Sequence, residues 1–191
     1  PLENITFDNC FIFSGWNGGS LKFGRKELRG GIARNITFKN CEVVMYNSSA
    51  LTIDVLYHTH VSNVVFDNIT VHVAPFPRLW TEEQKTGRKS PMLMNFFIEI
   101  WPAGRPNVDF ISPTGRRISA TEVRGHISNI EVRNIYVYGE KMIPSLINGW
   151  DGAHQVKNIL IENIYFNDVK IDDIDGLMID RNEFTGNIVF K

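Results

Sequence analysis

Asp54 and two histidines lie close enough in this 191-residue chain to act together. Asp54 follows the segment Ala-Leu-Thr-Ile at 50–53, and alternate residues of an extended strand share a face, so His58 and His60 fall on the same side. A carboxylate beside two imidazoles can supply an acid, a base and a clamp for a substrate. The same residue types also occur in metal sites. An exposed polar face at a turn is the structural alternative, and we assign no metal or other cofactor.

A second group lies in a loop that contains glycine. Trp150, Asp151 and His154 bring together an aromatic ring, a carboxylate and an imidazole. A tryptophan ring can stack on a sugar, while Asp and His can bind hydroxyl groups or transfer protons. We take Asp151 and His154 as catalytic candidates and Trp150 as a substrate-binding candidate. The alternative is a structural turn that Asp151 caps.

Two further segments combine aromatic and charged residues. Trp16 lies in a glycine-rich segment shortly before Arg25 and Glu27, a combination that suits an anionic sugar. Glu99 and Trp101 share one face of an apolar stretch, and partial burial there is the environment that a general acid needs. For both segments, an ordinary solvated surface is the alternative.

An internal repeat must position these residues. The motif N-[IV]-x-[FVI]-x-N-[CI] recurs along the chain, and its last copy ends at Lys191. The copies start 31, 28, 66, 29 and 29 residues apart, at Asn4, Asn35, Asn63, Asn129, Asn158 and Asn187. Apolar and polar residues alternate within each copy, which indicates a β-strand. The repeat also explains why the chain contains 18 Asn and 22 Ile.

The period of the repeat predicts the fold. Short strands recurring about every 29 residues leave no room for helices between them, so each strand pairs with its equivalent in the next repeat. We therefore expect an all-β parallel β-helix of about seven coils that forms one domain over residues 1–191. The 66-residue interval indicates two periods with insertion loops around 74–89 and 102–117. A strand between 90 and 101 would complete the seventh coil.

The motif also predicts which way its side chains point. The Ile or Val after the first Asn, and the apolar residue two positions later, should face the core. The second Asn should lie at a bend, because Asn tolerates the left-handed backbone conformation. Stacked Asn side chains can then form hydrogen bonds between repeats. Cys10 and Cys41 follow the second Asn, and we expect them to be reduced thiols in an inward column.

Composition excludes two classes of partner. The formal net charge of −1 argues against a broad electrostatic nucleic-acid binder. No window approaches the roughly 18 to 20 apolar residues of a membrane span. The chain opens inside a repeat with no capping helix. We therefore expect either that it is the C-terminal part of a longer β-helix or that another chain covers the open end.

Longer segments at 18–24, 50–54 and 144–154 each precede a copy of the motif. Together with the repeats they look like the C-terminal part of bacterial glycosidases related to the polygalacturonases, glycoside hydrolase family 28. The resemblance implies a right-handed, single-stranded parallel β-helix. It also implies a secreted or periplasmic protein that hydrolyses a plant or algal, pectin-like polysaccharide or oligosaccharide with carboxylate acid and base groups.

The family's N-T-D, D-D, G-H-G and R-I-K motifs do not occur in the family's form. The only adjacent aspartates, Asp172 and Asp173, lie in a polar turn, so no catalytic residue is carried over from the family. Three other functions remain open: a non-catalytic glycan-binding or adhesin-like protein, a tailspike-like structural protein, and a polysaccharide lyase.

Overall fold

The computed structural model describes most of the chain, namely residues 1–14, 20–23, 31–45, 49–55, 59–75, 91–98, 110–111, 117–118 and 125–191. This part is almost entirely β-structure. Its one helical element is the three-residue 3-10 helix η1 (Asp175–Leu177). No helix in the described part is long and apolar enough to cross a membrane.

The larger sheet contains eight strands and carries all six copies of the motif. Its order is β1 (Leu2–Asp8), β4 (Ile32–Met45), β6 (His60–Val73), β10 (His126–Tyr138), β12 (Val156–Phe166) and β13 (Val169–Lys170), while β2 (Phe11–Ser14) pairs with β4 and β15 (Thr185–Phe190) with β12. All pairs are parallel except β12 with β13. Equivalent motif residues lie opposite each other, so the repeat sets the register.

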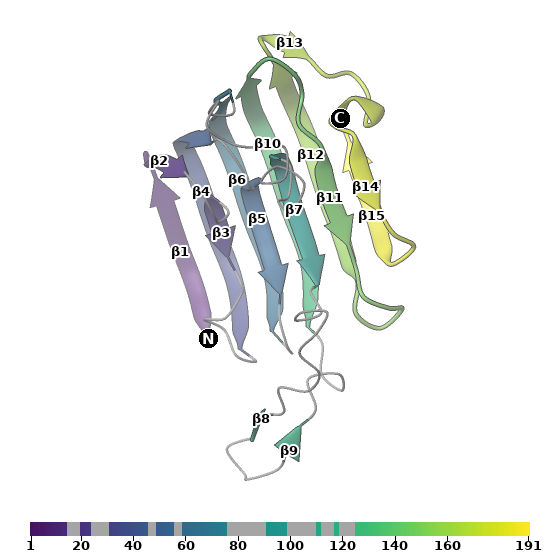
Figure 1. Ribbon diagram of the computed structural model, residues 1–191. Helices are drawn as coiled ribbons and strands as arrows, with labels where there is room; N and C mark the ends of the chain where they lie inside the picture. The colour runs from purple at the N-terminus through teal and green to yellow at the C-terminus, as the bar shows by residue number, and fades with distance from the viewer. Residues whose placement is uncertain are drawn as a thin grey trace, which may run out of the picture.

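A smaller, wholly parallel sheet supplies the second layer. Its order is β14 (Ile179–Arg181), β11 (Ser145–Asn148), β7 (Met92–Ile98), β5 (Ser49–Val55) and β3 (Leu21–Phe23). A separate antiparallel pair joins β8 (Phe110–Ile111) to β9 (Arg117–Ile118). Figure 1 shows the strands of both sheets following one another from β1 at one side to β14 and β15 at the other.

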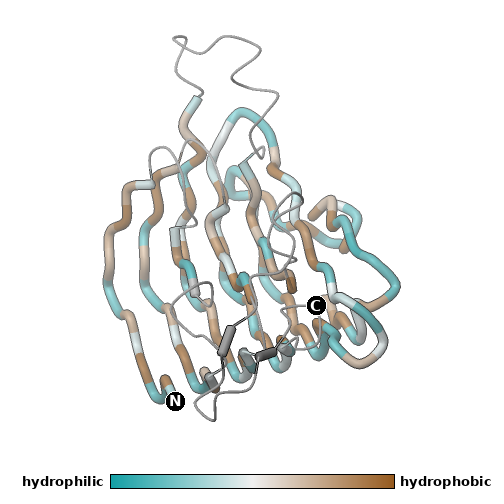
Figure 2. Tube along the Cα trace, turned by 60° about the horizontal axis from the view of Figure 1, so that its bottom comes forward, coloured by the Kyte–Doolittle hydropathy of each residue, from teal (hydrophilic) through white to brown (hydrophobic). Residues whose placement is uncertain are grey.

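One apolar core fills the space between the two sheets. Ile36 and Val64 follow the first Asn of their motifs and are fully buried, as the sequence predicts. The rings of Phe38 and Phe66 stack with centroids 5.2 Å apart. Phe96 from the smaller sheet stacks on Phe66 with a centroid distance of 5.9 Å. Figure 2 shows apolar and polar stretches alternating along each turn of the chain. Burial of the alternate apolar residues therefore holds the two layers together.

Both asparagines of the motif adopt the left-handed conformation. Asn35 has φ 58° and Asn40 has φ 53°, and the other motif asparagines have similar values. The bend at the second Asn is therefore confirmed, and the structure adds an equivalent bend at the first. First asparagines form a continuous ladder in which each side-chain amide donates to the preceding repeat, at 2.9 to 3.1 Å, through Asn35, Asn63, Asn129, Asn158 and Asn187.

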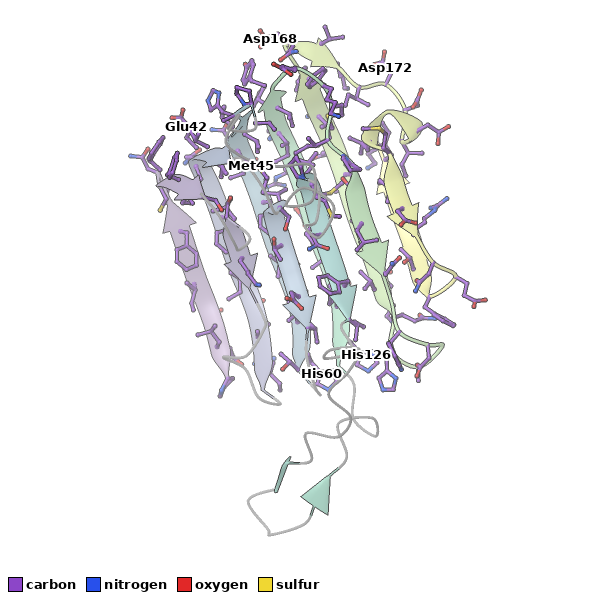
Figure 3. All side chains as sticks on the ribbon, viewed as in Figure 1. Glu42, Met45, His60, His126, Asp168 and Asp172 are labelled. Carbon is purple, nitrogen blue, oxygen red and sulfur yellow. The ribbon has the colours of Figure 1, made fainter. Side chains whose placement is uncertain are left out.

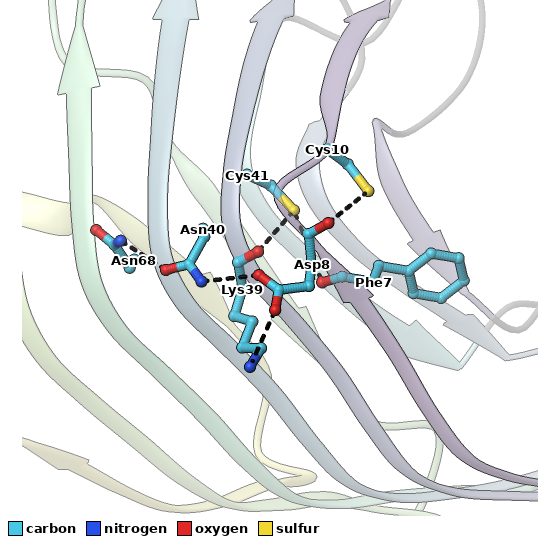
Figure 4. A network of polar contacts seen from close by, with 7 residues as sticks. All are labelled: Phe7, Asp8, Cys10, Lys39, Asn40, Cys41 and Asn68. Atoms are coloured by element: carbon cyan, nitrogen blue, oxygen red, sulfur yellow. Dashed lines mark hydrogen bonds and ion pairs between the residues drawn. The ribbon is translucent and has the colours of Figure 1, made fainter.

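The second asparagines form a ladder that carboxylates interrupt. Asn68 donates to Asn40 at 2.8 Å, but Asn40 itself donates to Asp8 at 2.8 Å. Figure 4 shows Asp8 held between Asn40 and the ammonium of Lys39, which lies 3.1 Å away. Further along the sheet, Asn134 likewise bonds to a carboxylate rather than to the preceding Asn. The predicted Asn stacking is thus confirmed, with Asp replacing Asn as the acceptor at two places.

The prediction of seven repeats is wrong. β6 and β10 pair directly over eleven residues, so the 66-residue interval contains one period with a long insertion rather than two periods. The strand expected between 90 and 101 exists as β7, but it lies in the smaller sheet between β5 and β11. Sequence spacing alone could not reveal this, because a strand of either sheet shows the same alternation. Most of 74–89 and 102–117 lies outside the described residues.

The two cysteines occupy the predicted column. Cys41 is buried, and its thiol donates to the backbone oxygen of Lys39 at 3.1 Å. Burial is the main reason that the pKa of the Cys41 thiol is raised. Cys10 is half-buried at the β1–β2 edge of the sheet (Figure 4). Both are free thiols, and Cys41 acts as a small core residue rather than as a reactive group.

Candidate functional site

The outer face of the smaller sheet carries a row of polar residues. Leu51 and Ile53 of β5 point into the core, so Thr52 and Asp54 point the other way. The register places Thr52 between Lys22 of β3 and Asn95 of β7. Three parallel strands thus bring an ammonium, a hydroxyl, a carboxylate and an amide onto one face. We call Lys22, Thr52, Asp54, Asn95 and Asn148 the polar row.

An ion pair and hydrogen bonds organise the polar row. The Lys22 ammonium lies 3.4 Å from Oδ2 of Asp54, whose side chain is 4% exposed. Thr52 shares a 2.7 Å hydrogen bond with Ser49, which accepts a longer bond of 3.5 Å from the Asn95 amide. A charge so well buried requires a partner, and Lys22 provides one. The row is therefore a pre-arranged and largely buried polar cluster, in which Thr52, Asp54 and Asn95 are each at most 5% exposed.

Two amide oxygens of the polar row are buried without a hydrogen bond to the described part of the chain. They are Oδ1 of Asn95 and Oδ1 of Asn148, the last residue of β11. Buried polar groups are nearly always hydrogen-bonded to protein, water or ligand. These two oxygens are consequently acceptor positions for hydroxyl or amine donors brought by a ligand or by water.

A stack of three histidines lies where the strands of the larger sheet begin. The ring centroids of His60 and His126 are 4.9 Å apart, and those of His126 and His154 are 5.4 Å apart. β6 begins at His60 and β10 at His126, and His154 lies just before β12. Figure 3 shows His60 and His126 at the same end of the molecule.

Asp151 positions the last histidine of the stack. Its Oδ1 lies 2.8 Å from Nδ1 of His154 and accepts backbone N–H groups of Ala153 and His154, also at 2.8 Å. Desolvation raises the pKa of Asp151, but these hydrogen bonds outweigh it and leave the pKa below its ordinary value. The loop is thus the Asp-capped turn that the sequence offered as an alternative, and it fixes the His154 ring.

The central histidine of the stack, His126, has a lowered pKa. Burial is the largest cause, and the neighbouring His60 and His154 lower the pKa further, with a smaller effect from Lys157. Asp151 acts in the opposite direction but does not compensate. His126 therefore stays neutral to lower pH than an exposed histidine and keeps a hydrogen-bond acceptor available.

The structure brings only some of the predicted residues together. Asp54 and His60 do not share one strand face, because β5 ends at Val55 and His60 begins a strand of the other sheet. Trp150 is half-buried against the core, so its ring is not an open platform. The other candidates lie outside the described residues: Trp16, Arg25, Glu27, His58, Glu99 and Trp101.

Sequence reasoning missed several residues of these clusters. Lys22, Asn95 and Asn148 occupy outward positions of successive strands, and only the register of the smaller sheet aligns them with Asp54. His126 was visible as a third histidine at the start of a repeat strand, one residue before Ile127, which is equivalent to Val61 after His60. Within the described ranges, no group of three or more His, Cys, Asp or Glu side chains is arranged to hold a metal ion.

A second exposed line of side chains lies at the opposite end of the long strands. Glu42 pairs with His72 at 3.0 Å, and the His72 ring stacks on Tyr138 at 5.4 Å. Tyr138 donates a 2.7 Å hydrogen bond to Asp168, which raises the pKa of the tyrosine. Figure 3 places Glu42 and Asp168 far from His60 and His126. This line therefore forms a separate surface from the histidine stack.

The fold and the polar row define a class of protein: an all-β protein of parallel sheets with a polar outer sheet face. Comparison with known proteins adds nothing more specific, since no family model, curated protein or solved structure matches the chain.

Proposed function

We propose that the chain forms a right-handed, single-stranded parallel β-helix that binds a polysaccharide along the polar row and hydrolyses its glycosidic bonds. The fold proposal is supported by the alternation of the two parallel sheets along the chain, in which each strand of the smaller sheet follows one of the larger. Connections between parallel strands are nearly always right-handed, which supports the right-handed form of the proposed β-helix.

The polar row is the observation that carries the function. Polysaccharides present many hydroxyl groups at regular intervals, and they require both donors and acceptors along an extended surface. Lys22 donates, while Asp54 and the two unsatisfied amide oxygens of Asn95 and Asn148 accept. These groups come from four neighbouring strands, so the row runs across the sheet in the direction that an extended ligand would take. Asp54 and Asn95 are only 3% and 5% exposed, so in our proposal binding must uncover them.

Asp54 is the carboxylate placed for the chemistry. Hydrolysis needs one carboxylic acid to protonate the leaving oxygen and a second carboxylate to activate water or attack the sugar. Asp54 takes one of these roles in our proposal. Glu99 follows Phe97, the register partner of Asp54, by two residues in the sequence, and it is our candidate for the second carboxyl.

One observation favours a non-catalytic glycan-binding protein instead. Asp54 is the single buried carboxylate among the residues that the structure describes, and Asp151 is occupied in capping its turn. A site with one carboxylate, an ammonium and amides binds sugars without cleaving them. Binding measurements and product release must therefore be made on the same variants.

The test measures reducing-sugar release and binding on a panel of pectic and other plant or algal polysaccharides. Asp54→Asn removes the charge with little change in shape, and Lys22→Met removes its partner. Asp151→Asn probes the turn, and Asp172→Asn, in an exposed loop, is the matched control (Figure 3). We expect release to fall at least about a hundredfold in Asp54→Asn, as for loss of an acid or base, and to be unchanged in Asp172→Asn.

The outcomes separate the alternatives. Binding without release by the unaltered chain, with weaker binding by Lys22→Met, would support the non-catalytic function. Equal activity of Asp54→Asn and the control would exclude the polar row as the active site. Thermal unfolding of every variant distinguishes loss of function from loss of fold.

A further inference from the structure

A groove follows the bend that the second asparagines of the motif make in the larger sheet. It has a volume of about 270 Å³ and draws its lining from three successive copies of the motif. The lining includes Phe11, Asn40, Glu42, Asn68 and Thr70. Pockets for drug-sized ligands have volumes of about 300–1,000 Å³, so this slightly smaller groove suits a ligand of about one or two sugar rings.

The register of the larger sheet explains the position of the groove. One outward register column contains Phe11, Glu42, Thr70, Tyr136 and Tyr165. The rings of the two tyrosines stack with centroids 5.1 Å apart and fill the column in their part of the sheet. Thr70 has a much shorter side chain than its neighbour Tyr136 in the column. The short side chain therefore leaves room for a ligand where a tyrosine would otherwise lie.

Glu42 supplies the groove with an oriented and accessible carboxylate. Its Oε1 lies 3.0 Å from Nε2 of His72, and its side chain is 52% exposed. The His72 ring stacks on Tyr138, whose hydroxyl donates a 2.7 Å hydrogen bond to Asp168. This line of contacts holds Glu42 through one oxygen. The other oxygen, Oε2, has no partner in the described part of the chain and can accept hydrogen bonds from a ligand.

The rest of the lining combines neutral polar groups with an aromatic ring. The Asn68 amide donates a 2.8 Å hydrogen bond to Asn40, which fixes the amides along the groove (Figure 4). Thr70 adds a hydroxyl group and Phe11 an apolar wall, while no Lys or Arg is among the described lining residues. The Glu42 carboxylate repels an anionic ligand. The hydroxyl groups of a neutral sugar can instead donate to it, and the C–H groups of the sugar can pack on the aromatic ring.

We propose that this groove is a second carbohydrate site, which takes neutral sugar units rather than anionic uronates. It belongs to the larger sheet, whereas the polar row belongs to the smaller sheet. The inference rests on the proposed function in one respect, because a single polysaccharide supplies the ligands of both sites. Attachment at two places raises the overall affinity, because the second contact forms at a high effective concentration.

Isothermal titration calorimetry with cellobiose, xylobiose and galactobiose, and with digalacturonate as the anionic counterpart, tests the proposal. Thr70→Tyr fills the groove with the side chain that its register partner Tyr136 already carries, so it should abolish binding of the neutral disaccharides. Glu42→Gln should weaken their binding roughly tenfold, because a hydrogen bond to a charged acceptor is lost. Thr37→Tyr is the matched control, because it makes the same change at an outward position of β4 before the bend. We expect it to bind normally.

Asp54→Asn separates the two proposals, because the groove does not use the polar row. It should retain the binding of neutral disaccharides that Thr70→Tyr abolishes. Failure of every neutral disaccharide to bind, or unchanged binding by Thr70→Tyr or by Glu42→Gln, would overturn the groove as a site. Digalacturonate binding that Thr70→Tyr abolishes would overturn its preference for neutral sugars.

Binding that is lost in Asp54→Asn but kept in Thr70→Tyr would also overturn the second site and leave the polar row as the place of binding. Groove binding in a chain that releases no sugar from any polysaccharide would contradict the proposed hydrolysis alone. Thermal unfolding of each variant shows whether a loss of binding reflects a loss of fold. Glu42→Gln provides the independent arm, because it changes one exposed side chain and leaves its size unaltered.

Discussion

Asn129 donates a 3.1 Å hydrogen bond to the side-chain oxygen of Asn63, although 66 residues separate them in the sequence. This bond joins the two halves of the larger sheet across the long insertion. It also supports the register of β6 against β10, in which the equivalent residues of the two motif copies lie opposite each other. Asn63 belongs at once to a hydrogen-bond ladder and to a left-handed bend, with φ 55°.

Two substitutions at Asn63 separate these roles. Asn63→Gly keeps the left-handed conformation and loses the ladder bonds, which should lower the free energy of unfolding by about 1 to 2 kcal/mol. Asn63→Ala also suffers the left-handed penalty, so we expect a loss of about 2 to 3 kcal/mol. Urea unfolding measures both, and equal stability of the two variants would argue against strain at this bend.

The phenylalanine column should show a gradient of stability. Phe66 is fully buried between Phe38 and Phe96, so Phe66→Ala should cost about 3 to 5 kcal/mol. Phe7 occupies the same column at the open edge, where we expect Phe7→Ala to cost about 1 kcal/mol. The comparison is made by urea unfolding at low protein concentration, and similar losses at both sites would mean that the edge is covered in solution.

Gly125 should not tolerate a side chain. A Cβ there would lie 1.8 Å from the backbone oxygen of Thr59 and 2.8 Å from a methyl group of Val55. Backbone must move to relieve this clash, so Gly125→Ala should destabilise the fold by about 3 kcal/mol. Gly152→Ala is the matched control, because nothing lies within 4 Å of a Cβ at that position. Circular dichroism melting curves of the two variants give the comparison.

The histidine stack should make the protein less stable in acid. The pKa of His126 is lowered in the folded state by burial and by His60 and His154, so the unfolded chain takes up its proton more readily. The contribution of neutral His126 to the free energy of unfolding is fully present above pH 6.5, the ordinary pKa of histidine. It declines as the pH falls below that value. The pKa of Asp151 is also lowered, which adds a separate loss below its ordinary value of 3.8.

Melting temperatures between about pH 8 and 5, taken for His126→Gln and the unaltered chain, check this effect. The variant keeps a polar side chain of similar size but cannot be protonated, so its melting temperature should fall less over this range. His72→Gln is the control, because His72 lies at the other end of the long strands, 3.0 Å from Glu42 and away from the histidine stack. An identical pH profile for His126→Gln would show that the stack does not sense protons.

The sequence by itself determined the strands and the direction of their side chains. Alternation within the motif placed Ile36 and Phe38 in the core, and the tolerance of Asn for positive φ predicted the bend at Asn40. These features are local, because they follow from the two-residue period of a strand and from the conformational preference of one residue type.

Only the tertiary structure decided which strands are neighbours. It placed β10 beside β6, moved β7 into the smaller sheet, and aligned Lys22 and Asn95 with Asp54. It also buried Asp54 and assembled a histidine stack from three segments that are far apart in the sequence. Such relationships depend on hydrogen bonds between distant strands, and an alternating sequence satisfies either sheet equally well until those bonds select one.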